Sequence, residues 1–471
     1  MISEERGLPD SFDPKTGKNI KWSAELGTET YSTPIVAGGR VYIGTNNGQP
    51  RDPKHEGDRG VLMCFDEKSG QFLWQLVVPK RDEDRFMDWP NAGISSPVTV
   101  EGDRVYLVSS RGEVMCLDAR GMTNGNDGPY RSEGAHMTPR NSESGIQKPE
   151  LKPGPLDADI LWLLDLKEAV GIWPHDAAHS SILIQGNYLY LNTGTGVDNT
   201  HKRIRTPDAP SLVVLDKNSG KLVARDDEHF ATNIFHCTWS APSLGTVGVR
   251  PLVFFAGGNG VIYAFETITS SSEAVQHLKK VWQFDFDPTA PKGDIHPYLS
   301  NRREGPSNIY GMPVFYRNRI YVAGGGDIFW GKNEASLKCM DASKTGDITT
   351  NALIWSYPLA RHVMSTPAID HGLLFIADCG RNLHCLDAES GQPYWTQEIK
   401  GDAWASPLVA DGKVYLGTRT GAFYVLAAAR EKKLLSSIEF GSPISATTTA
   451  ANGVIYIATM LRLYAVQKNS P

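Results

Sequence analysis

The 471-residue chain lacks the features that mark several common classes of protein. No apolar run reaches the roughly 18–20 residues that a membrane-spanning helix needs, so we expect no membrane span. The net charge is -6 and charged residues make up 21% of the chain, which gives no indication of a basic surface for nucleic acid. No stretch shows a convincing helical period of apolar residues. These absences favour a globular protein built from elements other than long helices.

The N-terminal stretch "MISEERGLPDSFD" also lacks the basic start and apolar segment of a secretory signal. We expect a periplasmic or secreted protein whose signal is absent from this sequence, and a cytoplasmic location stays open. None of the six cysteines adjoins another. Cys64, Cys116, Cys339 and Cys385 occupy one place in a repeated phrase, which favours small buried hydrophobic side chains over disulfides or metal ligands.

That repeated phrase runs through most of the chain. An apolar run near Ser-x-Pro is followed by a glycine-centred turn, a strand such as "VYIG", a second turn, a strand ending in Asp, and "SGxxxW". Each unit predicts four short strands, because its apolar runs are rich in Val, Ile, Leu, Tyr and Phe and bounded by Gly, Asp or Asn. Eight first strands can be placed, near 33–36, 95–98, 180–184, 240–244, 311–315, 365–369, 406–409 and 446–450.

The strands at the two ends of the chain together make up one complete four-stranded unit. The last unit has three strands and ends at "LRLYAVQ", whereas the chain begins with an unmatched strand, "NIKWSAEL". Its Trp22 matches Trp74, Trp162, Trp282, Trp355 and Trp395 of later units. We therefore predict an all-β fold, an eight-bladed β-propeller of four-stranded antiparallel blades closed by the N-terminal strand pairing in the last blade. Residues 1–18 are expected to form an N-terminal extension, 19–471 a single domain, and 119–158 a loop inserted in blade 2.

The period and the pattern "LDAESGQPYW" resemble the tryptophan-motif repeats of the pyrroloquinoline-quinone-like propeller superfamily, over roughly residues 19–467. The resemblance implies the propeller fold. Members include quinone-dependent alcohol and sugar dehydrogenases, outer-membrane assembly scaffolds and many proteins of unknown role in environmental bacteria. The dehydrogenases typically use two adjacent cysteines joined in a ring, a tryptophan floor under the quinone, and carboxylates around a calcium ion. This sequence has no Cys-Cys pair, so the cofactor is left unknown, with pyrroloquinoline quinone as one alternative.

The loops predicted on one face of the propeller are very uneven. Blades 1, 3 and 5 carry the long loops "TNNGQPRDPKHEGDRG", "TGTGVDNTHKRIRTPDAPS" and "AGGGDIFWGKNEAS", and the connections before blades 2 to 5 are long as well. Blades 6 to 8 have short loops on the same face. Because long loops on a compact scaffold usually carry function, we expect a funnel over the central channel, walled by blades 1 to 5.

Two sets of candidate residues lie at the predicted mouth of this funnel. The candidate catalytic residues stand in connecting loops where no packing pattern explains them: His175, Asp176, His236, Arg361 and His362. The candidate ligand-binding residues are Glu29, Tyr31, Trp89, Asn91, Trp239, Tyr310, Asp402 and Trp404. Aromatic rings beside polar groups suit a polar, ring-shaped ligand such as a sugar. A histidine or tyrosine base with an arginine would also support proton abstraction.

Other histidines are given smaller roles. His179 falls in a slot, three positions before the proline of Ser-x-Pro, that is usually large and is expected to fill space between blades. His55 and His201 are interpreted as solvated histidines of long loops, with a lid role as the alternative. Four residues of extended chain cover about 13 Å, so His175 and His179 are not expected to share a metal. Three imidazoles, or two with Asp176, could meet across the channel, but no short motif fixes them and no metal is predicted.

The sequence leaves three functions open. The first is a propeller that binds a polar small molecule or glycan in its funnel and that could be carbohydrate-active. The second is a protein-binding scaffold of the outer-membrane assembly type, and the third is a quinone-dependent dehydrogenase. The expected partners are accordingly a small molecule or glycan, or a protein, and the chain is expected to be a monomer.

Overall fold

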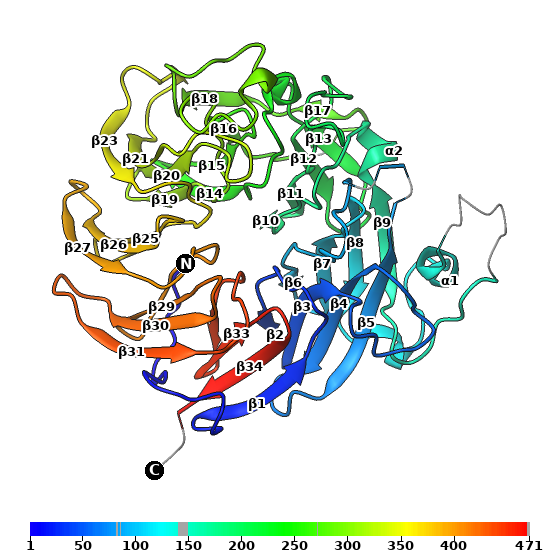
Figure 1. Cartoon of the computed structure of the whole chain (residues 1–471). Coiled ribbons are helices and arrows are strands. Elements are labelled where there is room, and N and C mark those ends of the chain that lie inside the picture. The colour runs from blue at the N-terminus through cyan, green and yellow to red at the C-terminus, as the bar shows by residue number, and fades with distance from the viewer. Residues whose placement is uncertain (82, 85, 140–148, 271, 469–471) are drawn as a thin grey trace.

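The computed structural model describes residues 1–81, 83–84, 86–139, 149–270 and 272–468. In this part of the chain the strands form eight sheets, arranged as blades around a central axis (Figure 1). The predicted eight-bladed β-propeller is therefore confirmed. Within the same residues, no helix has the length and apolar character needed to cross a membrane.

Each blade takes its strands in chain order from the axis outward, except that the outermost strand of blade 8 is β1, the first strand of the chain. Blades 1 to 4 contain β2 (Ile35–Ala37), β3 (Arg40–Asn46), β4 (Arg59–Asp66), β5 (Phe72–Pro79); β6 (Thr99–Glu101), β7 (Arg104–Val108), β8 (Glu113–Asp118), β9 (Ile160–Asp165); β10 (Leu183–Gln185), β11 (Tyr188–Asn192), β12 (Leu212–Asp216), β13 (Leu222–Arg225); and β14 (Ser243–Val247), β15 (Arg250–Ala256), β16 (Val261–Glu266), β18 (Lys280–Asp285).

The remaining blades follow the same order. Blades 5 to 8 contain β19 (Val314–Tyr316), β20 (Arg319–Gly325), β21 (Ala335–Asp341), β23 (Leu353–Leu359); β24 (Ala368–Asp370), β25 (Leu373–Ala377), β26 (Asn382–Asp387), β27 (Pro393–Glu398); β28 (Leu408–Ala410), β29 (Lys413–Gly417), β30 (Ala422–Ala427), β31 (Leu434–Glu439); and β32 (Thr449–Ala451), β33 (Val454–Ala458), β34 (Arg462–Gln467), β1 (Ile20–Glu25). Short helices occur in the connections: η1 (Gly121–Asn124), α1 (Glu133–Met137), α2 (Leu166–Val170), η2 (Phe230–Asn233) and η3 (His296–Tyr298).

The innermost strands are shorter and start later than the sequence predicts. Seven of the eight span three residues, and each begins at least two residues after its predicted start. The proline of Ser-x-Pro has no backbone N–H to donate to a ladder, so pairing starts only beyond it. The residues before the strand are thereby left as irregular chain that faces the axis.

The ring is closed by the two ends of the chain. Strand β1 pairs antiparallel with β34, with Trp22 opposite Ala465 and Ser23 opposite Tyr464. Figure 1 shows β1 lying along the outer edge of the last blade. The predicted closure is therefore confirmed.

The repeated tryptophan joins each blade that has it to the next one. The indole Nε1 of Trp22 donates to the Glu67 carbonyl of blade 1 at 2.9 Å, and that of Trp74 donates to the Ala119 carbonyl of blade 2 at 3.0 Å. Four further indoles bond in the same way: Trp162, Trp282, Trp355 and Trp395. The repeat "SGxxxW" therefore encodes contacts between blades in addition to a strand.

Two short strands extend blades beyond the four that the sequence predicts. Strand β17 (Gln276–His277) belongs to the connection after β16 and pairs parallel with β13 of the preceding blade. Strand β22 (Gly346–Asp347) likewise pairs parallel with β18 of the preceding blade. Both add backbone hydrogen bonds between blades at the outer rim of the ring.

The first residues of the chain pack against blade 7. Ile2 forms a parallel bridge with Val409. Leu8 and Phe12 are buried in the cluster that contains Tyr415 and Phe423. This segment therefore adds apolar contacts to the ring before β1 begins, and Figure 1 shows its blue trace beside the strands of blade 7.

The connection between β8 and β9 is the long stretch expected to be an insertion, and residues 140–148 of it lie outside the described part. Its helix α1 lies on the outer side of blades 1 and 2 (Figure 1). His136 Nε2 lies 3.1 Å from the buried carboxylate of Glu113, and Asp157 bridges to Gln75. The described ends of this stretch are thus attached to the propeller.

The core consists of apolar clusters shared between neighbouring blades. All six cysteines are buried and unpaired, as expected for the four that recur in the repeat.

The contact between tryptophan and glycine at the blade junction can be tested. Gly220 and Gly186 lie in blade 3 with φ of +69° and +61°, so alanine strains both backbones. A Cβ on Gly220 would lie 2.4 Å from the Trp162 ring, whereas a Cβ on Gly186 meets nothing within 4 Å. We expect Gly186→Ala to cost about 1 kcal/mol and Gly220→Ala about 1–3 kcal/mol more, measured as shifts of the denaturation midpoint. Equal losses for the two variants would contradict this role of the glycine.

Candidate functional site

A cavity of about 400 Å³ opens at the mouth of the central channel. Connections into the first strands of seven blades supply most of its lining, and the β11–β12 and β20–β21 loops supply the rest. The lining residues are Tyr31, Trp89, Ala92, Ser95, Asp176, His179, His201, His236, Trp239, Phe329, Trp330, Met364, Trp404 and Ser445. The sequence predicts a wall from blades 1 to 5, but Met364, Trp404 and Ser445 show that blades 6 to 8 line the cavity as well.

Aromatic rings form much of the cavity wall. Trp89 and Phe329 remain 42% and 43% exposed, although both are large apolar side chains. The rings of Tyr31 and Trp404 stack with centroids 6.2 Å apart, and the guanidinium of Arg419 lies 4.4 Å from the Trp404 centroid. The wall therefore offers flat apolar surface that the protein itself leaves open.

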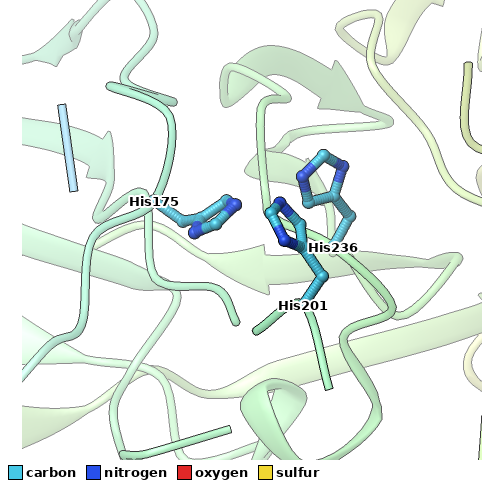
Figure 2. Close-up of side chains that lie close together, drawn as sticks. All are labelled: His175, His201 and His236. Atoms are coloured by element: carbon cyan, nitrogen blue, oxygen red, sulfur yellow. The ribbon is translucent and has the colours of Figure 1, made fainter. Parts of the chain in front are cut away.

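A cluster of three histidines lies at one side of the cavity (Figure 2). His175 precedes β10, His201 belongs to the β11–β12 loop, and His236 precedes β14. Their ring centroids are 4.9–5.3 Å apart. One ring nitrogen from each lies within 4.8 Å of the others, so these residues could hold a metal ion.

The carboxylate of Asp176 lies between two of these histidines. Its Oδ1 is 3.5 Å from Nε2 of His175, and its Oδ2 is 3.3 Å from Nε2 of His236. Asp176 and Ala177 both have a left-handed backbone, with φ of 55° and 50°. Such strain persists only where surrounding contacts hold it, and here the backbone N–H groups of these two residues donate to the carbonyls of Phe86 and Met87. The turn thereby keeps Asp176 beside His175.

A second carboxylate, that of Asp327, fixes the orientation of His236 from behind. His236 Nδ1 donates to Asp327 Oδ2 at 3.0 Å, and the Tyr310 hydroxyl donates to the same oxygen at 2.7 Å. The backbone N–H groups of Phe329 and Trp330 donate to Oδ1 at 2.9 and 2.8 Å. Because Asp327 is fully buried and held on both oxygens, it directs Nε2 of His236 towards Asp176.

The surroundings shift the pKa values of these groups in opposite directions. Burial lowers the pKa of His175 to about 4, against the charge of Asp176, and burial also lowers the pKa of His201. Burial opposes the protonation of His236, but Asp327 and Asp176 outweigh it and raise that pKa to about 9. Burial alone would raise the pKa of Asp327, but the charge and hydrogen bond of His236 lower it to about 2. Without a metal, His236 is therefore the protonated member of the cluster at neutral pH.

The structure brings together seven of the residues that sequence analysis selected: His175, Asp176 and His236 in the cluster, and Tyr31, Trp89, Trp239 and Trp404 in the wall. Tyr310 lies behind the wall, where it holds Asp327. Glu29 accepts from the Tyr31 hydroxyl at 2.9 Å and lines a neighbouring surface pocket.

Four further selected residues neither belong to the histidine cluster nor line the cavity in the described part of the chain. The backbone N–H of Asn91 donates to the carboxylate of Asp58, and Oδ1 of Asp402 lies 3.7 Å from Nε of Arg381. Arg361 is exposed, with φ of 63°. His362 is buried, and burial lowers its pKa. The proton-abstraction arrangement with Arg361 therefore gains no support from the cavity lining.

Some residues have positions that the sequence did not indicate. The interpretation of His55 as a solvated histidine is wrong, because His55 is buried beside Asp157. His201 is half-buried and contacts His175, His236 and Trp330. His179 is buried, as expected of a filler, but it also lines the cavity. Asp327, Phe329 and Trp330 were missed. The signal that could have indicated them is the pair of adjacent aromatic residues, Phe329 and Trp330, in the long loop "AGGGDIFWG".

The fold and the cavity define a closed-ring propeller whose channel mouth carries an aromatic pocket with a histidine cluster. Comparison with known proteins agrees on the fold. A family model described as "Outer membrane protein assembly factor BamB" matches residues 10–121 and 333–434. A tetrathionate hydrolase of Acidithiobacillus ferrooxidans is 26% identical over 133 residues, which cover 24% of this chain and 27% of that protein. The match therefore spans only about a quarter of the relative.

Solved structures with the same fold cover nearly the whole chain. BamB from Moraxella catarrhalis aligns with a TM-score of 0.55 and 13% identity, over 95% of this chain and 97% of that one. A europium-containing methanol dehydrogenase aligns with a TM-score of 0.57 and 12% identity, over 97% and 87%. The family model matches less than half of the chain and agrees with the resemblance to the pyrroloquinoline-quinone-like superfamily, and the two solved structures show the same β-propeller fold.

The cavity does not fit the quinone of that superfamily. Pyrroloquinoline quinone carries three carboxylates and needs cationic partners, but the described lining contains no arginine or lysine and no cysteine. The buried carboxylate of Asp327 and that of Asp176 oppose an anionic cofactor there. The donor set of this cavity therefore gives no support to quinone-dependent dehydrogenation.

The hydrogen bonds of Asp327 can be tested through stability. Asp327→Ala leaves His236 and the backbone N–H groups of Phe329 and Trp330 without their acceptor, so we expect a loss of about 3–5 kcal/mol. Tyr310→Phe removes one hydrogen bond to the charged group and should cost about 2 kcal/mol. Denaturant unfolding of both variants measures the difference. An Asp327→Ala variant no less stable than Tyr310→Phe would show that Asp327 does not organise this loop.

Proposed function

We propose that the propeller binds a polar, ring-shaped small molecule, such as a sugar unit, in the cavity at its channel mouth. The observation that carries this proposal is the exposure of Trp89 and Phe329 within the cavity. A folded protein gains free energy by burying such side chains. Large aromatic rings left open in a concave, largely preformed site are typical of ligand pockets.

The shape and chemistry of the cavity favour a small ligand that has both an apolar face and polar hydroxyl groups. Its volume of about 400 Å³ falls in the range of small-molecule sites, about 300–1,000 Å³. Trp239 and Trp404 provide flat faces against which the apolar face of a sugar ring packs. Asp176 and His201, across the cavity, provide an acceptor and a half-buried imidazole for hydroxyl groups.

One comparison bears on the setting of this function. A periplasmic or secreted location, with a monomeric chain, is part of the proposal, and the match to an outer-membrane assembly factor supports that location. The same match favours a second candidate function, a scaffold on which a protein partner docks. A scaffold of this kind needs neither the open aromatic rings nor the cluster of buried histidines.

Removing an aromatic face tests the proposed function. We expect Trp404→Ala to weaken binding of a saccharide at least about tenfold, equivalent to ~1.4 kcal/mol, because the stacking surface is lost. Neutral mono- and disaccharides are the probes, and calorimetric titration with a thermal-shift screen is the measurement.

Tyr394→Ala provides the matched control, since this aromatic side chain lies on the outer strand β27 and bonds Asp387. It should bind the same saccharides as the unchanged protein. If no saccharide of the panel binds, or if Trp404→Ala binds as tightly as Tyr394→Ala, the ligand proposal fails and the scaffold function is favoured.

A further inference from the structure

We propose that His175, His201 and His236 form a three-histidine site for a divalent transition-metal ion of the zinc type, open towards the cavity. This inference deepens the proposed function, because the ion would meet the polar groups of a ligand bound in the same cavity. The three imidazoles come from three separate connections and converge with ring nitrogens within 4.8 Å of one another (Figure 2).

Unpartnered polar atoms at the cluster point to a shared cation. Nε2 of His175, Nε2 of His236 and Oδ1 of Asp176 are buried and have no hydrogen-bond partner among the described residues. Buried polar atoms are nearly always partnered, and here Nε2 of His175 lies 3.5 Å from Oδ1 of Asp176, while Nε2 of His236 lies 3.3 Å from Oδ2. A cation that binds the two imidazole nitrogens and the carboxylate, with release of the Nε2 proton of His236, satisfies these groups at once.

The carboxylate of Asp327 orients His236 as a metal ligand. Its Nδ1 donates to Asp327 at 3.0 Å, which leaves Nε2 on the side of His175 and His201. Metal-bound histidines commonly donate their other ring N–H to a carboxylate, which fixes the ring and increases its basicity. Asp327 is itself held by Tyr310 and by two backbone N–H groups, so the orientation is built before any ion binds.

The backbone around the cluster is shaped to bring its segments together. Gly196 forms a bridge with Cys237, and the N–H of Val197 donates to the His236 carbonyl at 3.0 Å. A Cβ on Gly196 would lie 2.6 Å from that carbonyl oxygen and 3.0 Å from Cβ of His175. The approach of His175 to His236 therefore depends on a glycine at this position.

The donor set indicates the class of metal. Imidazole suits zinc and its neighbours rather than calcium or magnesium, and three histidines with one open position are a known arrangement of catalytic zinc. Tetrahedral zinc holds its nitrogen ligands about 3.4 Å apart. The half-buried His201, on its loop, is the ligand whose adjustment closes the cluster to that spacing.

Two other groups in the described residues have the spacing of a metal site, but other groups of the chain already contact their carboxylates. In the group of Asp52, His55 and Asp157, the ammonium of Lys54 lies 2.5 Å from Asp157 and 3.3 Å from Asp52. In the group of Asp118, Asp127 and Asp159, backbone N–H groups donate to Asp118 and Asp159. His55 also has unpartnered ring nitrogens, but of these three groups the histidine cluster is the one in which unpartnered nitrogens of two histidines, His175 and His236, meet at one carboxylate.

Metal binding by the whole protein tests the inference without any saccharide. After treatment with a chelator, the protein should take up one equivalent of zinc, and zinc should raise its thermal midpoint. His201→Ala, a change at a half-buried loop residue, should weaken zinc binding at least about 100-fold. His175→Ala and His236→Ala should do the same, and His229→Ala, which removes an exposed imidazole outside the cluster, should not.

Cobalt provides a second readout that reports geometry. Co²⁺ bound by three histidines in a four-coordinate site gives intense visible absorption, which should appear in the unchanged protein and in His229→Ala but not in His201→Ala. No stoichiometric zinc binding, binding lost in His55→Ala but kept in His201→Ala, or a cobalt spectrum insensitive to His201→Ala would each overturn the inference.

The two proposals fail separately. Zinc uptake without saccharide binding would leave the metal site intact and remove the sugar ligand. Saccharide binding that Trp404→Ala weakens, in a protein that takes up no zinc, would keep the proposed function and overturn the metal site.

Discussion

In six of the eight blades, the tryptophan of the outermost repeat strand donates its indole N–H to a carbonyl of the next blade. Where a glycine turn lies beneath the ring, as at Gly220 under Trp162, only the absence of a side chain lets the blades approach so closely. This contact fixes the spacing of the blades, and β1 then closes the ring against β34. The diameter of the channel, and so the site at its mouth, depends on that spacing.

The closed ring also explains how connections with little regular secondary structure form a defined site. The connections that enter the first strands are held at one end by short strands and at the other by the outer strand of the previous blade. They have little regular structure of their own, yet seven of the eight contribute to one cavity. Rigid blades position irregular segments, which is the usual way in which loops carry function on a stable scaffold.

The site combines an aromatic wall with a cluster of buried charged side chains. The buried Asp327 and His236 lie beside the aromatic wall, and the low polarity of these surroundings strengthens the electrostatic interactions among His236, Asp176 and Asp327. Those buried charges would be costly unless paired, and the hydrogen bonds of Tyr310 and of the Phe329 and Trp330 backbone supply part of the pairing. The loop that carries Asp327 therefore joins wall and cluster, since Phe329 and Trp330, two and three residues further along it, belong to the wall.

The sequence by itself determined the number of blades, the closure by the N-terminal strand and the face that carries long loops, because these follow from short-range repetition of strands, turns and tryptophans. It also selected His175, Asp176 and His236, which no packing pattern explains. Only the tertiary structure decided that His201 joins them, that Asp327 lies behind His236, and that Arg361 stays outside the cavity. Each of those positions depends on how loops from different blades meet across the channel, and no local pattern of residues encodes a contact between segments so far apart in the chain.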